Sequence, residues 1–419
     1  MLPPMQTPLH APKTTQLKRS ISLPMITLYG LGTTIGGGIY VLIGSVAGRA
    51  GIYAPLSFIV AALMVSFTAL SFAELTSRFP KSAGEAVFIR EGLNSKTLAI
   101  IAGYLVVFNG IVSSAALVDG FVGYFNTIIT VPDGVAIIGV IVLIGLLACW
   151  GISESITIAA LITIIEIGGL GVIIWVGRDA FNDWPALTNI MLPPFDLSIW
   201  SGIFAGSFLA FYAFIGFEDM VNVAEEVTAP QRTLPMAIVL TLGITTLLYV
   251  AVALVVISAA PIDELTANDA PLLMVYQIKT GNSGEIISLI SIMAVLNGVL
   301  IQVIMGSRVL YGMAMQGWSL NLFSRVHSLT QTPVIATLAV VLLTSLFAFA
   351  FELEALAQST SLIMLVISVL VNLSLFQIKR GQVSVPDGGL NLPIFVPLAG
   401  FCVSAVFGSF VAIDLFQNF

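Results

Sequence analysis

Eleven long apolar stretches, separated by short charged or polar segments, limit the fold of this 419-residue sequence more than any other feature. Each stretch holds the roughly 20 residues that a helix needs to cross about 30 Å of hydrocarbon. Only helices and closed β-barrels satisfy their backbone hydrogen bonds in lipid, and the short alternating segments of a barrel do not occur here. We therefore expect an all-α polytopic membrane protein with spans at 20–48, 50–73, 97–118, 134–153, 155–177, 197–217, 233–262, 286–307, 326–351, 355–378 and 388–413.

The composition supports a membrane protein with the lipid bilayer as its surroundings. The chain is 58% hydrophobic and 9% charged, whereas soluble domains carry about 25% charged residues. No basic stripe suggests a nucleic-acid partner. Residues 1–19 are polar and contain proline, and they lack the short apolar core of a signal peptide. We expect a disordered cytoplasmic tail over 1–19 and a single transmembrane domain over 20–419.

The positions of Lys and Arg predict the orientation. Only Arg49, Arg178 and Lys279 of the 15 basic residues fall on one side of the predicted membrane, and all the others fall on the opposite side. Basic residues concentrate in cytoplasmic loops. The sequence therefore predicts a cytoplasmic N-terminus and an external C-terminus in the cell membrane.

The first span contains the glycine-rich run "GLGTTIGGGIYVLIG", residues 30–44. A glycine in a helix interior costs roughly 1 kcal/mol relative to alanine, so the cluster predicts an unwound segment at mid-membrane. Its unpaired backbone groups can bind a polar ligand, and the following half-helix offers its N-terminal dipole to a carboxylate. The alternative is that these glycines only allow close helix packing.

A second interruption is predicted five spans later. Span six carries Gly216 followed by Glu218 and Asp219. Because five is odd, a second group of five spans would be an inverted copy of the first, as in many secondary transporters. We expect repeat one at about 20–177, repeat two at about 197–378 and an extra eleventh helix at about 388–413.

Four segments resemble the amino acid–polyamine–organocation family of transporters. They are "GLGTTIGGGIYVLIGSVAGRAG", "ALSFAELTSRFPKSAGEAVFI", "FIGFEDMVNVAEEVTAPQRTLPMAI" and "GSRVLYGMA". The resemblance covers spans one to eight well and implies a five-plus-five inverted-repeat (LeuT-like) fold, alternating access and a substrate between spans one and six.

The resemblance also implies a set of substrate-binding residues. The carboxylate of the substrate would meet backbone N–H groups at Gly36, Gly37 and Gly38, and Gly37 stands where relatives often have Ser. Its ammonium would meet carbonyls near Thr34 and Ile35 in span one and near Ala213, Phe214 and Ile215 in span six. The remaining implied contacts are Gly216 at the second interruption, the aromatic Tyr212, and Asn109 and Ser114 in span three.

Glu166 is the only charged residue between Glu154 and Arg178. Function is the default hypothesis for such a carboxylate, since burial disfavours the anion. Proton coupling is favoured, while Na⁺ coordination with backbone and hydroxyl oxygens and a neutral structural role remain open. Some proton-coupled relatives have Lys in the segment matching "ITIIEIGGL", so their mechanism does not transfer unchanged.

Three other acidic residues are expected to have structural or gating roles. Glu218 is expected to brace the unwound segment by accepting hydrogen bonds, with direct contact to the substrate as the alternative, and Asp219 follows it. Asp119 lies near the outer end of span three, where solvated carboxylates are ordinary. In addition, Glu74 and Arg78 have the spacing of a helical ion pair.

The sequence thus predicts a secondary transporter that imports an amino acid, with the proton as coupling ion, Na⁺ as the other candidate, and no cofactor. The alternatives are a polyamine or simple-amine carrier, a Na⁺-coupled carrier or exchanger, and an amino acid sensor that does not transport. An enzyme is not expected. The only histidines, His10 and His327, lie outside the predicted hydrocarbon or at its edge, and no Gly precedes a Lys-Ser/Thr pair as a P-loop requires.

Overall fold

A computed structural model describes residues 19–126, 129–150, 152–182, 184–268, 270–351, 353–382, 385–386 and 389–417. Long α-helices dominate these residues, and the only β-structure among them is a single bridge between Ile21 and Val227. The all-α prediction is confirmed. The tail predicted over 1–19 lies outside the described residues, apart from Arg19.

Each of the eleven predicted spans coincides with a helix. In chain order these are α1 (Leu23–Ala50), α2 (Ala54–Arg78), α4 (Lys96–Asn126), α5 (Asp133–Trp150), α6 (Ile152–Val176), α8 (Leu197–Phe214), α9 (Pro230–Ala259), α12 (Glu285–Met315), α13 (Val334–Ala350), α14 (Leu353–Arg380) and α15 (Phe395–Gln417). The connections contain the shorter helices α3 (Gly84–Leu93), α7 (Trp184–Met191), α10 (Ile262–Thr266) and α11 (Pro271–Thr280), and the 3₁₀ helices η1 (Gly51–Tyr53), η2 (Arg178–Phe181), η3 (Phe217–Glu226) and η4 (Asn321–Ser324).

Length and hydropathy support membrane crossing. Eight helical segments of the described chain are long and apolar enough to span a bilayer, and one of them joins the second half of α1 to α2. Two shorter apolar helices, Val334–Ala350 and Phe395–Ser409, accompany them. The prediction of a polytopic membrane protein is therefore confirmed.

Local sequence signals explain where the helices begin. Proline occupies one of the first two positions of α1, α2, α9 and α11, where its missing N–H costs no intrahelical bond. By contrast, the N-cap residue of α8 is Asp196, whose carboxylate accepts hydrogen bonds from the N–H groups of Ser198 and Ile199. That cap satisfies two of the four N–H groups that a helix start leaves unpaired.

The largest differences from the predicted helix starts are at α13 and α15. α13 begins at Val334 instead of 326 because the preceding residues turn, with the His327 N–H donating to the Thr332 carbonyl. α15 begins at Phe395 instead of 388. The residues before it run along α2, where the N–H groups of Leu390 and Leu392 bond to Ser77 and Glu74.

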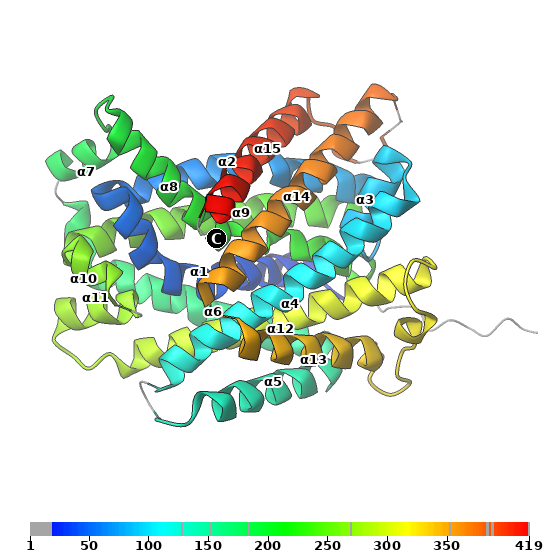
Figure 1. Cartoon of the computed structure of the whole chain (residues 1–419), viewed down its shortest axis with the longest axis horizontal. Helices are drawn as coiled ribbons and strands as arrows, with labels where there is room; N and C mark the ends of the chain where they lie inside the picture. Colours follow the sequence, from blue (N-terminus) through cyan, green and yellow to red (C-terminus); the bar gives the residue numbers. More distant parts are fainter. Residues whose placement is uncertain are drawn as a thin grey trace, which may run out of the picture.

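The long helices pack in two groups (Figure 1). In one group, α1, α2, α8 and α9 pack on one another. In the other, α12 packs on α4, α5 and α13, and α13 also contacts α4 and α5. α6 lies against both α1 and α12, so it bridges the groups. α14 contacts α4 and α15, and α15 returns to α2.

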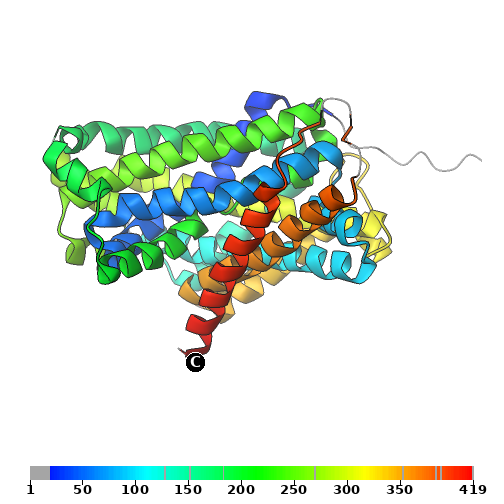
Figure 2. The ribbon, with the colours of Figure 1, turned by 90° about the horizontal axis from the view of Figure 1, so that it is seen from above.

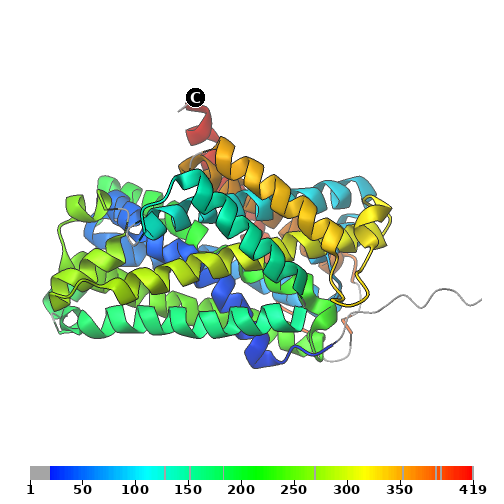
Figure 3. The same cartoon turned by 90° about the horizontal axis from the view of Figure 1, so that it is seen from below.

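The connecting helices separate to opposite ends of the bundle. Figure 1 shows α7, α10 and α11 at one end of the long axis and α3 at the other. α15 crosses the outside of the bundle, and its C-terminal end projects from the body in both rotated views (Figures 2 and 3). We call the end with α3 the α3 end, and the other the α7 end.

Candidate functional site

The first helix is interrupted at Gly36. This residue has φ 16° and ψ −144°, whereas the helix continues on both sides of it. Before the break, the hydroxyls of Thr33 and Thr34 donate to carbonyls one turn back, at Tyr29 and Gly30. The break falls inside the glycine cluster, as the sequence predicted.

The second predicted interruption is also present. α8 ends at Phe214, Ile215 is extended, and Gly216 has φ 124°, a value that favours glycine. The chain then continues as the ten-residue 3₁₀ helix η3, although such helices seldom exceed four residues. Glu218 braces this turn, because its Oε2 accepts a 2.9 Å hydrogen bond from the Gly216 N–H.

The two breaks lie against each other. A Cβ atom added to Gly216 would lie 2.8 Å from the carbonyl carbon and oxygen of Thr33. One added to Gly38 would lie 3.0 Å from the Cα of Ala213. Backbone thus meets backbone at both glycines, which leaves little room for a side chain at either position.

Tyr249 of α9 joins the two breaks. Its hydroxyl lies 2.6 Å from the carbonyl oxygen of Thr34 and 2.9 Å from that of Ala213, and the ring is fully buried. Both carbonyls belong to the set predicted to receive the substrate ammonium. The sequence analysis missed Tyr249, since one tyrosine in the apolar run "TTLLYVAVALVV" carries no signal of its own.

A small cavity opens at the junction of the breaks. The cavity has room for little more than one water molecule. Its wall is uncharged and combines hydroxyl, amide and apolar groups, contributed by Thr33, Thr34, Gly38, Ser113, Leu117, Tyr212, Ile215 and Gln302.

The cavity includes some of the predicted substrate residues and not others. Thr34, Gly38, Tyr212 and Ile215 line it. In α4 the lining residues are Ser113 and Leu117, and the predicted Ser114 is not among them, because successive helical residues differ by about 100° in direction. Asn109 is buried. Ile35, Gly36, Ala213, Phe214 and Gly216 belong to the two interrupted segments but are not among the lining residues. The surroundings of Gly37 lie outside what the structure describes.

Glu166 lies in a buried polar cluster where α6, α12 and α1 meet. Its Oε1 accepts a 2.8 Å hydrogen bond from Asn297 Nδ2, which also contacts Thr163 Oγ1 at 3.1 Å. The Tyr40 hydroxyl donates to the backbone carbonyl of Glu166. A Cβ atom on Gly32 would lie 2.2 Å from Thr163 Oγ1 and 2.7 Å from Asn297 Nδ2. The glycine therefore makes room for the cluster, one turn before the α1 break.

The model of the family described as amino acid permease matches residues 21–417. The chain belongs to the amino acid permease family. This result confirms the resemblance found in the sequence motifs, and it places the chain in a family of permeases.

Three relatives illustrate the range of this family. The permease is 31% identical over 389 residues to the vacuolar cationic amino acid transporter 2 of Arabidopsis thaliana, covering 85% of this chain and 60% of the relative. It is 28% identical over 398 residues to the branched-chain amino acid permease BcaP of Bacillus subtilis, covering 88% and 83%. It is 26% identical over 352 residues to the methylthioribose transporter of the same bacterium, covering 79% and 74%. The chain spans about three fifths of the length of the plant vacuolar relatives.

The remaining predicted acidic residues of the permease lie in different surroundings. Asp219 is buried, and its Oδ2 accepts a 2.8 Å hydrogen bond from Nε2 of the cavity residue Gln302. Asp119, in the last two turns of α4, is partly exposed. Asp219 is therefore connected to the cavity wall, while Asp119 has access to the surroundings of the helix end.

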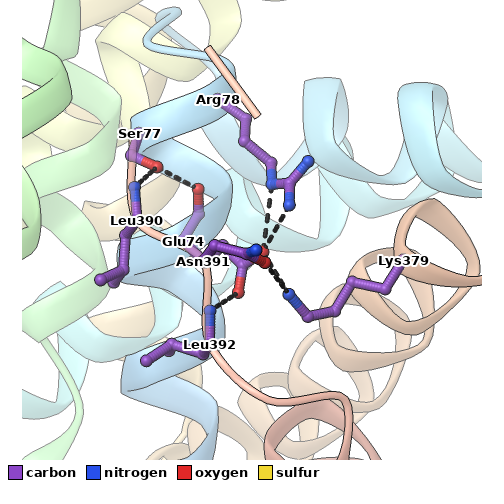
Figure 4. Close-up of polar contacts among 7 residues, drawn as sticks. All are labelled: Glu74, Ser77, Arg78, Lys379, Leu390, Asn391 and Leu392. Atoms are coloured by element: carbon purple, nitrogen blue, oxygen red, sulfur yellow. Dashed lines mark hydrogen bonds and ion pairs between the residues drawn. The ribbon is translucent and has the colours of Figure 1, made fainter. Parts of the chain in front are cut away.

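At the α3 end, the buried carboxylate of Glu74 joins α2 to α14 (Figure 4). Its Oε1 lies 2.7 Å from a guanidinium nitrogen of Arg78 and 2.5 Å from the Lys379 ammonium. Its Oε2 accepts a hydrogen bond from the Leu392 N–H. The predicted Glu74–Arg78 pair is confirmed, and the structure adds the cation and the backbone donor from distant segments.

Proposed function

We propose that this permease imports an α-amino acid by alternating access, and that protonation of Glu166 couples the import to the proton gradient. The observation that carries the proposal is the meeting of two broken helices at an uncharged cavity. Unwound backbone at membrane depth is tolerated only where it is buried in protein or lines a cavity. Paired interruptions of this kind are typical of substrate sites in secondary transporters.

The helix packing supports a five-plus-five inverted repeat. The first two helices of each proposed repeat, α1 with α2 and α8 with α9, form one group. The third and fourth, α4 with α5 and α12 with α13, form the other. Helices with the same position in the two proposed repeats thus pack in the same group, as an inverted repeat requires.

The substrate is proposed to lie across both breaks. Its carboxylate would face the N–H groups of Gly36, Gly37 and Gly38, at the start of the second half of α1. Its ammonium would meet the carbonyls around Thr34 and Ala213, which the Tyr249 hydroxyl contacts in this structure. The cavity is too small for an amino acid, so binding requires the two helix groups to move apart. The uncharged wall favours an amino acid with an uncharged side chain.

The surroundings of Glu166 support the proton over Na⁺ as coupling ion. The closest side-chain partner of the carboxylate is the Asn297 amide N–H, a hydrogen-bond donor. A Na⁺ site would instead need several converging oxygens. The α3 end, which carries Arg78, Lys81, Arg90 and Lys96, is proposed to be cytoplasmic. The cell membrane is the proposed location, although relatives are named as vacuolar, mitochondrial and chloroplastic.

Counterflow in proteoliposomes tests the substrate site. The purified protein is loaded with α-amino acids or with the amines that they yield on decarboxylation. We expect amino acids to exchange and amines to be poor substrates, because only the amino acids offer a carboxylate to the glycines. Gly38→Ala should abolish exchange, since the new Cβ would press on Ala213. Gly243→Ala is the matched control, because no atom lies within 4 Å of its Cβ position.

Two results would overturn the proposal. Better exchange of an amine than of its parent amino acid would indicate a polyamine or simple-amine carrier. Binding of amino acids without any exchange would indicate a sensor. Orientation is tested separately, by labelling Ser82→Cys and Asn189→Cys in intact cells, where we expect only the second to react with an impermeant reagent.

A further inference from the structure

The helix α3 docks on η3 through Asn222. The Gly84 N–H donates to Asn222 Oδ1 at 3.1 Å, and Asn222 Nδ2 donates to Glu85 Oε1 at 3.2 Å. A Cβ atom on Gly84 would lie 2.6 Å from a methyl carbon of Val221. The first turn of α3 is thus held tightly against the 3₁₀ helix that follows the α8 break.

Glu85 is buried at this junction and has no cation partner among the described residues. It is 1% exposed, and its Oε2 accepts no hydrogen bond from the part of the chain that the structure describes. α4, α14 and η3 pack against α3. Phe72 of α2 also contacts Phe88 of α3. Arg78 of α2 and Lys379 of α14 bind Glu74, Arg380 lies over the Phe376 ring, and Lys96 of α4 is exposed.

The groups on η3 do not compensate the charge of Glu85. Glu218 and Asp219 are both buried and of the same sign. Glu225 accepts a hydrogen bond from the Ser82 N–H, and Glu226 is paired with Arg308 at 3.7 Å. An anion at Glu85 would therefore be buried beside two other carboxyl groups. Burial, followed by the effect of Glu218, raises the pKa of Glu85 to about 8.

This junction is connected to the substrate cavity. Gln302 lines the cavity and binds Asp219, which lies next to Glu218 on η3. η3 in turn holds Glu85 through Asn222. A change in the docking of α3 therefore acts on the segment that directly continues the α8 break.

We propose that Glu85 is a proton-binding residue that controls the α3 end of the transport route. With its proton, Glu85 keeps α3 docked on η3. When the proton leaves to water on that side, the buried anion disfavours docking, and α3 separates from η3. This proposal depends on the proposed function in one respect only, because it takes the α3 end as the cytoplasmic exit. It does not depend on Glu166.

Hydrogen–deuterium exchange of the full-length protein in nanodiscs tests the site between pH 5.5 and 9.5. Exchange of the peptide covering 82–93 is corrected for the intrinsic pH dependence of amide exchange. The docked form binds the proton more tightly than the undocked form, so docking weakens as pH rises toward about 8. By linkage the corrected exchange should rise up to about tenfold per pH unit and level off above that value.

Two substitutions test whether Glu85 is the group that binds the proton. Glu85→Gln imitates the protonated side chain, keeps the acceptor for Asn222 and should make the corrected exchange independent of pH. Glu91→Gln, at an exposed position of the same helix, should behave as the wild type. A flat wild-type profile, or a rise that persists in Glu85→Gln, would overturn the proposal. Neither readout depends on transport, so failure of the proposed function would leave this test intact.

Discussion

Glu74 and Glu166 are both fully buried glutamates in a membrane protein, yet their surroundings differ completely. Glu74 has two cations and a backbone N–H within hydrogen-bond distance. Glu166 has one amide donor, and its second oxygen accepts no hydrogen bond from the described residues. The two cations compensate the charge of Glu74 and join α2 to α14. Glu166 has no cation partner among the described residues.

The comparison shows that burial alone does not identify a coupling residue. An ion pair compensates part of the desolvation cost of a buried charge, and removal of one partner leaves the other uncompensated. The partners of each carboxylate therefore distinguish a structural anion from a group that exchanges protons. The following substitutions test this distinction.

Glu74→Gln should have the largest effect on stability. It would leave Arg78 and Lys379 buried without their anion, at a cost of about 3–5 kcal/mol. A thermal-shift measurement in detergent should show a large fall in the apparent Tm, whereas Glu91→Gln should not change it. An unchanged Tm for Glu74→Gln would show that water already reaches this cluster. It would contradict the proposed difference between the surroundings of Glu74 and those of Glu166.

Gly32→Ala tests the packing around Glu166. The added Cβ would collide with Thr163 and Asn297, and overpacking of this kind costs about 1–3 kcal/mol. We expect a moderate fall in Tm together with loss of proton-driven uptake, since Asn297 must move away from Glu166. Gly243→Ala should be neutral in both measurements. Normal proton-driven uptake by Gly32→Ala would contradict a link between Glu166 and the packing next to the α1 break.

Asp179 represents a third kind of carboxylate, exposed and paired. The hydrogen bond from Lys279 holds the pKa of Asp179 below its ordinary value. The pair therefore contributes stability above the ordinary aspartate range, and this contribution is lost as pH falls through the lowered pKa. Because the carboxylate is largely exposed, Asp179→Asn should change stability by less than about 1 kcal/mol. Thermal shifts of Asp179→Asn and the wild type at pH 7, where the contribution is fully present, measure the difference. A loss as large as that of Glu74→Gln would contradict the role of burial.

The sequence predicts much of this architecture because lipid imposes simple rules. The apolar spans, the two interruptions at Gly36 and Gly216 and the isolation of Glu166 are all visible as local patterns. Gly216 is informative because its positive φ and its close approach to the Thr33 backbone disfavour a side chain. These features depend on composition along a few consecutive positions.

The missed features depend on contacts between distant segments. Tyr249 and Gln302 reach the breaks from α9 and α12, and no local pattern distinguishes them from ordinary helix residues. Ser113 replaced Ser114 at the cavity because one residue of helical phase decides which side chain faces it. Glu85 has no sequence signal either, since the absence of a cation appears only when α4, α14 and η3 are in place.

The most direct test of proton coupling at Glu166 is uptake into proteoliposomes with an imposed inward pH gradient. Wild-type protein should accumulate its amino acid faster with the gradient than without it, and without Na⁺. Glu166→Gln imitates the protonated form, so it should retain exchange between internal and external substrate while losing the acceleration. Glu91→Gln should respond as the wild type. Full gradient-driven uptake by Glu166→Gln, or wild-type uptake that ignores pH and requires Na⁺, would contradict the account.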